Sequence, residues 1–452
     1  MKTFTFAAIS SALAASVAAS PSVAKRAIAP VTVKGNAFFA GDQRFYVRGV
    51  DYQPGGEADA KDPIADAANC KRDLEKFKDL GVNTIRVYTV DNTANHDECM
   101  NALADAGIYL ALDVNTPKYS INRLEPEISY NKVYLQSLFA TIDAFAKYDN
   151  TLLFFSGNEV INDDATTSCA PFVKATTRDM KSYINARNYR KIPVGYSAAD
   201  VDSNRIEMAD YMNCGPDAIR SDFFAFNDYS WCSPSSFKTS GWDKKVETFK
   251  DYSLPLFLSE FGCIKNPRDF GEIEALYGDD MTAVYSGGLV YEYSVEKEPK
   301  YGLVTIDGDS RTETEDFQLL KAAFAKSKAP TGDAGYKTNG QASNCPDKST
   351  NWNVTIAADQ LPALPPGTDE YFKNGAGTGP GLQGSGSQTA GSKTTNLSSA
   401  ADGAVTSGAG TGAKPEGTKG AAASVHAPEF SLTPVVCGLV VLVSTLFGAS
   451  LI

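Results

Sequence analysis

The sequence predicts a closed barrel of eight parallel strands with intervening helices, the (β/α)8 or TIM-barrel fold, followed by a short disulfide-linked C-terminal extension. Short apolar runs alternate with longer segments of helical spacing over roughly 280 residues, as this fold requires. Two runs, Thr151–Val160 and Pro255–Gly262, contain a Glu at or near their ends, as buried strands that deliver a carboxylate do. A doubly wound open sheet is disfavoured, because the turn Gln53–Gly56 lacks a dinucleotide fingerprint.

Eight apolar runs are the expected strands: Phe45–Tyr52, Thr84–Val90, Tyr109–Asn115, Thr151–Val160, Pro193–Asp200, Phe223–Ser230, Pro255–Gly262 and Gly287–Ser294. The segments between them have helical spacing. In Cys70–Leu80, for example, Leu74, Phe77 and Leu80 share one face, and Gly81 ends the helix.

The composition of the flanking segments predicts how the chain is divided. Residues 1–19 are typical of a secretory signal peptide, because Lys2 precedes an Ala-rich apolar run that ends in small residues. The barrel is expected over residues 20–328 and a disulfide-held extension over 329–373. From 374 to 420 the chain is rich in Gly, Ser and Thr, which cannot bury a core, so a flexible stalk is expected.

Residues 421–452 match a GPI-anchor signal that is removed from the mature protein. The stretch 434–452 is uncharged and long enough to span a bilayer, yet no basic residue follows it. A polar spacer and small residues precede it. We therefore expect lipid attachment at Gly420 and a location at the plasma membrane and cell wall; a retained membrane helix is the alternative.

Charge and cysteine content narrow the function classes. The net charge of −12 argues against nucleic acid as a partner. Two His without metal-ligand spacing predict neither a metal nor a cofactor. Removal of Cys437 with the tail would leave seven cysteines, so at least one is free of an intrachain partner, and the others are expected to pair in an oxidising compartment. Sequons predict glycosylation at Asn353 and Asn396.

Glu159 and Glu260 are the candidate catalytic pair. Each closes a separate expected strand, the fourth and the seventh, so both lie at the barrel end where TIM-barrel active sites occur. Two carboxyl groups flanking a glycosidic bond are what its cleavage requires. A single Glu at a strand end is more often a solvated loop charge, and it is the pairing that favours catalysis.

Polar and aromatic residues close the other expected strands. Arg86 and Tyr88 share parity on the second strand, and Arg86 could hold a carboxylate ionised. Aromatic rings at a barrel mouth suit the C–H faces of sugars, although they can also simply fill the barrel top. Further residues at strand ends are Asp113, Asn115, Asp200, Asn227, Tyr229, Tyr291 and Tyr293.

Several motifs together carry a family resemblance: Gly49–Gly56, Asn83–Tyr88, Gly157–Glu159, Tyr229–Cys232, Ser259–Gly262 and Ser286–Tyr293. On these motifs the chain resembles the fungal β-1,3-glucanosyltransferases of glycoside hydrolase family 72. Because Cys345 alone lies between residue 264 and the tail, it resembles the branch that lacks a Cys-rich carbohydrate-binding module.

The resemblance implies roles for individual residues. Glu159 matches the general acid/base and Glu260 the nucleophile. Asn158, Tyr88 and Tyr291 match donor-side contacts, with Tyr293 the alternative to Tyr291; Tyr229 is a further expected sugar contact. The loop from Asn115 to Arg123, and the segment with Asp200 and Arg205, match acceptor-side contacts. The implied disulfides are Cys70–Cys99, Cys214–Cys345 and Cys232–Cys263, which leaves Cys169 unpaired.

The expected activity is retaining transfer of glucan. The enzyme would cleave a β-1,3-glucan internally and join the new reducing end to the non-reducing end of a second glucan. Its partners would be donor and acceptor glucan chains and, through the lipid, the outer membrane leaflet, with the protein itself monomeric. The alternatives are an endo-β-1,3-glucanase and a wall glucan-binding protein without catalysis.

Overall fold

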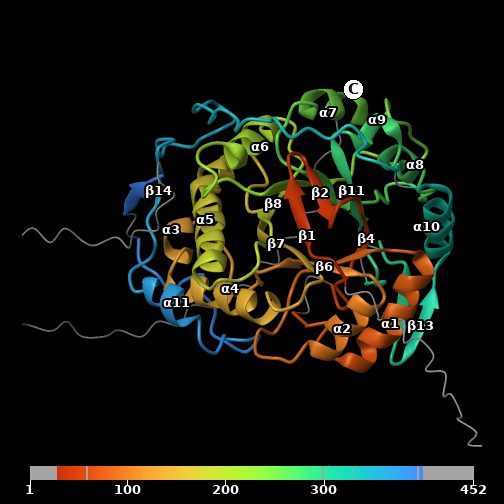
Figure 1. The fold of residues 1–452 in the computed structure, drawn as a ribbon, viewed down its shortest axis with the longest axis horizontal. Helices are drawn as coiled ribbons and strands as arrows, with labels where there is room; N and C mark the ends of the chain where they lie inside the picture. Colours follow the sequence, from red (N-terminus) through yellow and green to blue (C-terminus); the bar gives the residue numbers. More distant parts are fainter. Residues whose placement is uncertain (1–27, 57–59, 298–299, 329, 394–395, 401–452) are drawn as a thin grey trace, which may run out of the picture. The chain divides into compact units, whose positions relative to one another are not determined.

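The computed structural model describes residues 28–56, 60–297, 300–328, 330–393 and 396–400. Within these residues eight parallel strands form a closed barrel, in which each strand pairs with the next along the chain and the last with the first (Figure 1). The strands are β4 (Val47–Asp51), β5 (Thr84–Val87), β6 (Tyr109–Asp113), β7 (Thr151–Asn158), β8 (Val194–Ala199), β9 (Phe223–Asp228), β10 (Leu256–Phe261) and β11 (Tyr285–Val290). The predicted fold and all eight expected strands are confirmed.

Helices connect successive strands and cover the outside of the barrel. They are α1 (Ala67–Leu80), α2 (Asp97–Asp105), α3 (Pro126–Ser129), α4 (Lys132–Phe145), α5 (Ala170–Ala186) with the preceding turn η1 (Ala165–Cys169), α6 (Arg205–Asn213), α7 (Trp242–Phe249), α8 (Glu272–Leu276) and α9 (Asp279–Thr282). Helix α1 is capped at both ends by residues suited to that role. The Asp66 carboxylate accepts hydrogen bonds from the N–H groups of Ala68 and Asn69, and Gly81 ends the helix at φ 72°.

An amino-terminal sheet closes the end of the barrel opposite to the strand carboxyl ends. It consists of β1 (Val31–Lys34), β2 (Ala37–Ala40) and β3 (Gln43–Phe45), paired antiparallel. Phe38 packs against Phe223 and Phe257, with ring centroids 6.2 and 5.9 Å away. The sequence pattern does not predict this sheet, because its three short strands lie before the first barrel strand and lack a helical connection.

Three disulfides join the described cysteines in the pairs that the resemblance implies: Cys70–Cys99, Cys214–Cys345 and Cys232–Cys263. Cys169 is buried and unpaired, and its thiol donates to the carbonyl of Arg123 at 2.9 Å.

After β11 the chain forms a hairpin and a helix on the outside of the closed barrel, and then returns across the outside of other barrel helices. The elements are the hairpin β12 (Val304–Asp307) and β13 (Ser310–Glu313), helix α10 (Glu315–Lys326), β14 (Gln360–Pro362), α11 (Asp369–Asn374) and β15 (Leu397–Ser399). β15 pairs antiparallel with β14, and the buried guanidinium of Arg178 on α5 donates to the carbonyl of Pro362 at 2.9 Å.

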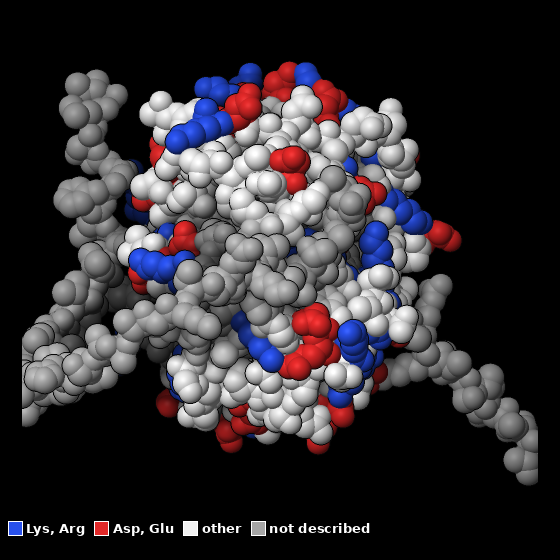
Figure 2. Space-filling model, turned by 90° about the vertical axis from the view of Figure 1, so that its left-hand side faces the viewer, with Lys and Arg blue, Asp and Glu red and all other residues white. Residues whose placement is uncertain are grey.

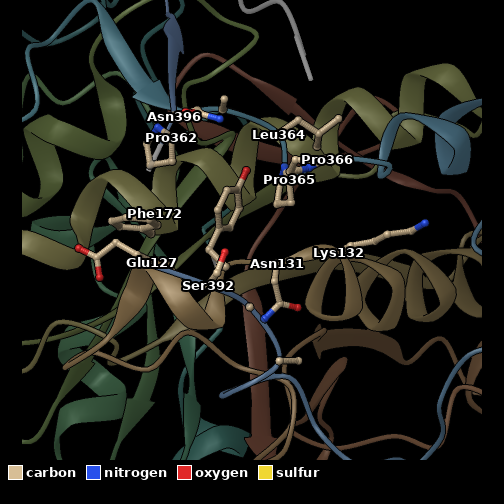
Figure 3. A pocket seen from close by; sticks show the side chains of 14 residues that line it. Glu127, Asn131, Lys132, Phe172, Pro362, Leu364, Pro365, Pro366, Ser392 and Asn396 are labelled. Atoms are coloured by element: carbon tan, nitrogen blue, oxygen red, sulfur yellow. The ribbon is translucent and has the colours of Figure 1, made fainter. Parts of the chain in front are cut away.

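Composition predicted a flexible stalk over residues 374–420, and the structure differs from this as far as residue 400; residues 401–420 lie outside the described residues. Residues 375–393 and 396–400 lie on the barrel, with backbone contacts such as Gly381 N–H to Asn92 at 3.0 Å and Ser387 O to Asn131 at 2.7 Å. Small residues cannot form a core, but they let the backbone approach polar side chains of the barrel. Figure 3 shows a cavity at this junction, where Pro365 and Ser392 lie near Asn131 and Phe172.

On the face shown in Figure 2, acidic and basic side chains lie next to one another. Among the described residues there is no helix long and apolar enough to cross a membrane, and no group of side chains that could hold a metal ion. The predicted signal peptide (1–19), Gly420 and the apolar tail 434–452 lie outside the described residues. Both sequon residues, Asn353 and Asn396, are exposed.

Candidate active site

A cavity of about 320 Å³ opens at the carboxyl ends of the barrel strands. Glu159 and Glu260 both line it, so the fold brings together two carboxyl groups that are about a hundred residues apart in the sequence. Other lining residues come from the segments after β4, β5, β6, β7 and β11: Gln53, Tyr88, Thr89, Asp113, Asn115, Thr116, Pro117, Ser120, Ile121, Arg123, Gly157, Asn158, Val160 and Tyr291.

Glu260, on β10, is buried and held by donors on both carboxyl oxygens. The Tyr88 hydroxyl donates to Oε1 at 2.8 Å and Arg86 Nη1 to the same oxygen at 3.1 Å. The Tyr229 hydroxyl donates to Oε2 at 2.7 Å. Hydrogen bonds to the charged form favour ionisation and fix the direction of the carboxylate.

Opposing effects set the acidity of Glu260. Burial raises its pKa to about 7, because water no longer solvates the charge. The Arg86 guanidinium acts in the opposite direction, and the neighbouring Glu159 adds to the increase. The hydroxyls of Tyr229 and Tyr88 also lower the pKa, so every donor that is removed should make this carboxylate easier to protonate.

Arg86, on β5, is fully buried between Asp113 on β6 and Glu260 on β10. Its Nε donates to Asp113 at 2.8 Å, on β6, while its Nη1 reaches Glu260 on the opposite side of the barrel. The guanidinium also lies over the ring of Phe155, 4.5 Å from the centroid. A guanidinium suits this position because it stays charged when buried and presents several donors in a fixed plane.

Glu159 follows the end of β7 in a left-handed backbone conformation, with φ 46°. A non-glycine residue is uncommon in this region, and such residues concentrate at functional sites. The backbone is held by hydrogen bonds from its N–H to the Ser197 carbonyl at 2.9 Å and from Arg123 to its carbonyl at 2.7 Å. The carboxylate is half-buried and accepts from the Asn227 amide at 2.8 Å.

Asn158 lies beside Glu159 within a polar network beneath the cavity. Its side-chain oxygen accepts from Ser197 at 2.7 Å and from Asn227 at 3.1 Å. Ser197 also lies 2.9 Å from the hydroxyl of Ser259, the residue before Glu260. The network therefore links the strand that carries Glu159 to the strand that carries Glu260.

Aromatic rings surround Glu260 at the mouth. The Tyr291 ring lies 6.5 Å from Tyr88, 6.3 Å from Tyr229 and 5.1 Å from Tyr301, in each case edge to face. Tyr293 points away: it is fully buried, and its hydroxyl donates to Asp73 at 2.7 Å. The sequence did not decide whether Tyr291 or Tyr293 is the sugar contact. Of these two residues, Tyr291 lines the cavity.

The expected acceptor-side residues divide into two groups. Asn115 and Arg123 line the cavity, and Asn115 accepts from the Tyr134 hydroxyl at 2.7 Å. Asp200 and Arg205 pair with each other but do not line this cavity; Asp200 also accepts from Lys245 at 2.6 Å.

Asp51 and Asn227 also belong to this site; Asn227 was expected only as a polar residue at a strand end, and Asp51 was not expected there. Asp51 ends β4 in register with Arg86, is fully buried, and has no hydrogen-bond partner for its carboxyl oxygens among the described residues. Burial raises its pKa well above the usual value, against the effect of Arg86. Its position at a strand end could have drawn attention to it; the link from Asn227 to Glu159 has no counterpart in the sequence.

Comparisons with known proteins agree with this geometry. A family model described as glucanosyltransferase, for glycoside hydrolase family 72, matches residues 20–328. The chain is 60% identical over 441 residues to the 1,3-beta-glucanosyltransferase gel1 of Aspergillus fumigatus, covering 97% of each chain. It is 53% identical to the 1,3-beta-glucanosyltransferase GAS5 of Saccharomyces cerevisiae, covering 81% of this chain and 76% of that one.

Solved structures of similar fold come from the same group of proteins. A crystal structure of Saccharomyces cerevisiae Gas2 with a small compound has a TM-score of 0.71 and 39% identity, over 76% of this chain and 78% of that one. A variant of Gas2 in complex with laminaritetraose and laminaripentaose has a TM-score of 0.69 and 39% identity, over 75% of each chain.

Proposed function

The chain belongs to the glucanosyltransferase family of glycoside hydrolases, family 72, and we propose that it transfers β-1,3-glucan by a retaining mechanism with Glu260 as nucleophile and Glu159 as acid/base. The observation that carries these roles is the difference between the two carboxyl groups. Glu260 is buried and fixed by Arg86 and two tyrosine hydroxyls, whereas Glu159 is half-buried and open to the cavity.

In the first step Glu260 attacks the anomeric carbon within a donor glucan. A bond forms between its carboxylate oxygen and that carbon while the glycosidic C–O bond breaks. Glu159 gives its proton to the leaving oxygen, so the reducing-end fragment departs as a neutral alcohol and Glu159 becomes a carboxylate. As negative charge leaves Glu260, Arg86 remains paired with Asp113, so the buried cation keeps a partner.

In the second step an incoming hydroxyl replaces Glu260. The ionised Glu159 takes the proton from the O3 hydroxyl at the non-reducing end of an acceptor glucan, whose oxygen then attacks the anomeric carbon and releases Glu260. Two inversions retain the β configuration. This double use of Glu159 requires the carboxyl groups to be about 5–5.5 Å apart.

Transfer exceeds hydrolysis only if a sugar reaches the glycosyl-enzyme before water does. Binding an acceptor on the leaving-group side raises its effective concentration at the anomeric carbon. We propose that residues 115–123 supply that binding, and their lining of the cavity, which includes Asn115 and Arg123, supports this. Transfer is therefore the function we favour over simple endo-hydrolysis.

A defined laminari-oligosaccharide tests the activity directly. Incubation with the protein should give products both shorter and longer than the substrate; only shorter products would mean hydrolysis, and an unchanged, bound substrate would mean a binding protein. Glu159→Gln and Glu260→Gln should each abolish turnover. Residual wild-type rates in either variant would contradict the assigned roles.

An activated donor separates the two roles. A β-glucan oligosaccharide with an aryl leaving group of low pKa needs no proton to depart, so Glu159→Gln should still form the glycosyl-enzyme and release the aryl alcohol in a burst. Glu260→Gln should release none. The covalent adduct should be found by peptide mass spectrometry on Glu260 alone.

We also propose the route to the cell surface that the sequence predicts: cleavage after residue 19, lipid attachment at Gly420, and glycans on Asn353 and Asn396. Phospholipase release and mass mapping of the mature termini test the first two. Deamidation of Asn353 and Asn396 after enzymatic deglycosylation tests the third, and size-exclusion chromatography with light scattering tests the expected monomer.

A further inference from the structure

Residues 380–388, which we call the strap, cross the outside of the loop that forms one wall of the catalytic cavity. The Lys118 ammonium donates to the carbonyl of Leu382 at 3.0 Å, and the Lys118 carbonyl accepts from the Ser387 N–H at 2.9 Å. The N–H of Gly386 donates to the Tyr119 hydroxyl at 3.2 Å. The strap is thus tied to two successive residues of the loop, Lys118 and Tyr119.

Further contacts extend this attachment on both sides. The half-buried amide of Gln388 donates to the carbonyl of Pro117 at 3.2 Å and to the Ser120 hydroxyl at 2.8 Å. At Gly384 an added Cβ would lie 2.0 Å from the Tyr119 hydroxyl, in a place where Tyr119 is almost fully buried. The strap therefore lies against the loop at a distance that only glycine permits.

The opposite side of the same loop faces the cavity. Thr116, Pro117, Ser120 and Ile121 line the cavity together with Glu159. Within the loop, the backbone pairing of Thr116 with Tyr119 closes a tight turn, with N–O distances of 3.1 and 3.0 Å. Most other bonds of residues 117–120 run to the strap, so the position of this turn relative to the catalytic carboxyls depends on it.

We propose that the strap is a specificity-determining element of the transfer reaction: it holds residues 116–121 in the shape that receives the acceptor glucan, and so favours transfer over hydrolysis. The inference rests on the proposed function. Its physical basis is preorganisation, because a wall that is already ordered does not lose conformational entropy when the acceptor binds. Water has no need of that wall, so hydrolysis does not gain from the strap.

Two variants in the full-length protein test the inference. Gln388→Ala removes the amide that binds Pro117 and Ser120. Gly384→Val pushes the strap away from Tyr119. With a laminari-oligosaccharide as donor and acceptor, we expect the ratio of transfer to hydrolysis to fall about threefold in the first variant, which loses the two bonds of Gln388, and about tenfold in the second, in which the whole strap is displaced. The rate of donor cleavage should stay within about twofold of wild type.

Gln136→Ala is the matched control. Gln136, on α4, also ties the carboxyl-terminal segment to the barrel through an amide, donating to the carbonyl of Ala376 at 3.2 Å, but it does not contact the loop. This variant should keep the wild-type ratio. The Michaelis constant for an added acceptor should rise in the strap variants and stay unchanged in the control.

An unchanged ratio in Gln388→Ala would overturn the inference, even if Gly384→Val failed to fold. An equal fall in Gln136→Ala would also overturn it, since the effect would then be general loosening of the segment. These outcomes are distinct from failure of the proposed function, in which the wild-type protein itself would form no elongated product.

Discussion

The hydroxyl of Tyr229 should set the pH at which Glu260, the proposed nucleophile, ionises. It donates to Glu260 Oε2 at 2.7 Å, and a hydrogen bond to a charged group contributes about 1.5–3 kcal/mol. At about 1.4 kcal/mol per pKa unit, Tyr229→Phe should raise the pKa of Glu260 by one to two units. The lower end applies, because Arg86 and Tyr88 continue to stabilise the carboxylate.

The direction of the change in activity follows from the charge. Glu260 must be ionised to attack, so a higher pKa moves the acid limb of kcat/KM toward higher pH. Since burial already raises the pKa to about 7, Tyr229→Phe should cut kcat/KM about tenfold below pH 6 and much less above pH 8. Initial rates on a laminari-oligosaccharide from pH 4 to 9 measure this shift.

Tyr293→Phe is the matched control. It removes a tyrosine hydroxyl that also donates to a carboxylate at 2.7 Å, but that carboxylate is Asp73, away from the cavity. It should lower stability without moving the acid limb. If the acid limb of Tyr229→Phe stayed in place or moved to lower pH, the assignment of Glu260 as the ionised nucleophile would be wrong.

Three further predictions concern stability and reactivity. Asp51→Asn should raise the melting temperature more at pH 7 than at pH 4. The fold raises the pKa of Asp51, so the folded protein loses stability as the pH rises above the pKa that this carboxyl has in the unfolded chain. A lower melting temperature of the variant at pH 7 would contradict this. Cys345→Ser should reduce the free energy of unfolding by about 2–5 kcal/mol in denaturant titrations, since its bond to Cys214 closes a long loop, and an unchanged midpoint would refute it. Cys169 should resist alkylation in the native protein and react after unfolding, as peptide mapping would show, because it is buried; rapid native labelling would count against its burial.

The sequence was sufficient to predict the barrel and the position of Glu159 and Glu260 at one cavity, because both depend on local pattern. Each barrel strand is a short apolar run, and Glu159 and Glu260 stand near the ends of two such runs. The fold then places the carboxyl ends of all eight strands around one opening. No knowledge of side-chain contacts was needed to expect these two carboxyl groups at the same cavity.

The contacts that tune the pair could not be predicted in this way. Asn227 donates a hydrogen bond to Glu159. Arg86 forms ion pairs with Asp113 and with Glu260. Such pairings depend on strand register. Composition failed most clearly after residue 374, where a Gly- and Ser-rich segment is held through its backbone. Backbone hydrogen bonds to a folded surface leave no periodicity in the sequence.

The pairing of β14 with β15 limits where the protein can be shortened. A soluble form that ended at residue 373, where composition would put the end of the folded part, would lose β15 and leave Leu361 and its neighbours on an unpaired strand edge. Exposed edges of this kind recruit other chains and promote aggregation. A version intended for crystallisation or for inhibitor screening should therefore extend to residue 400 or beyond.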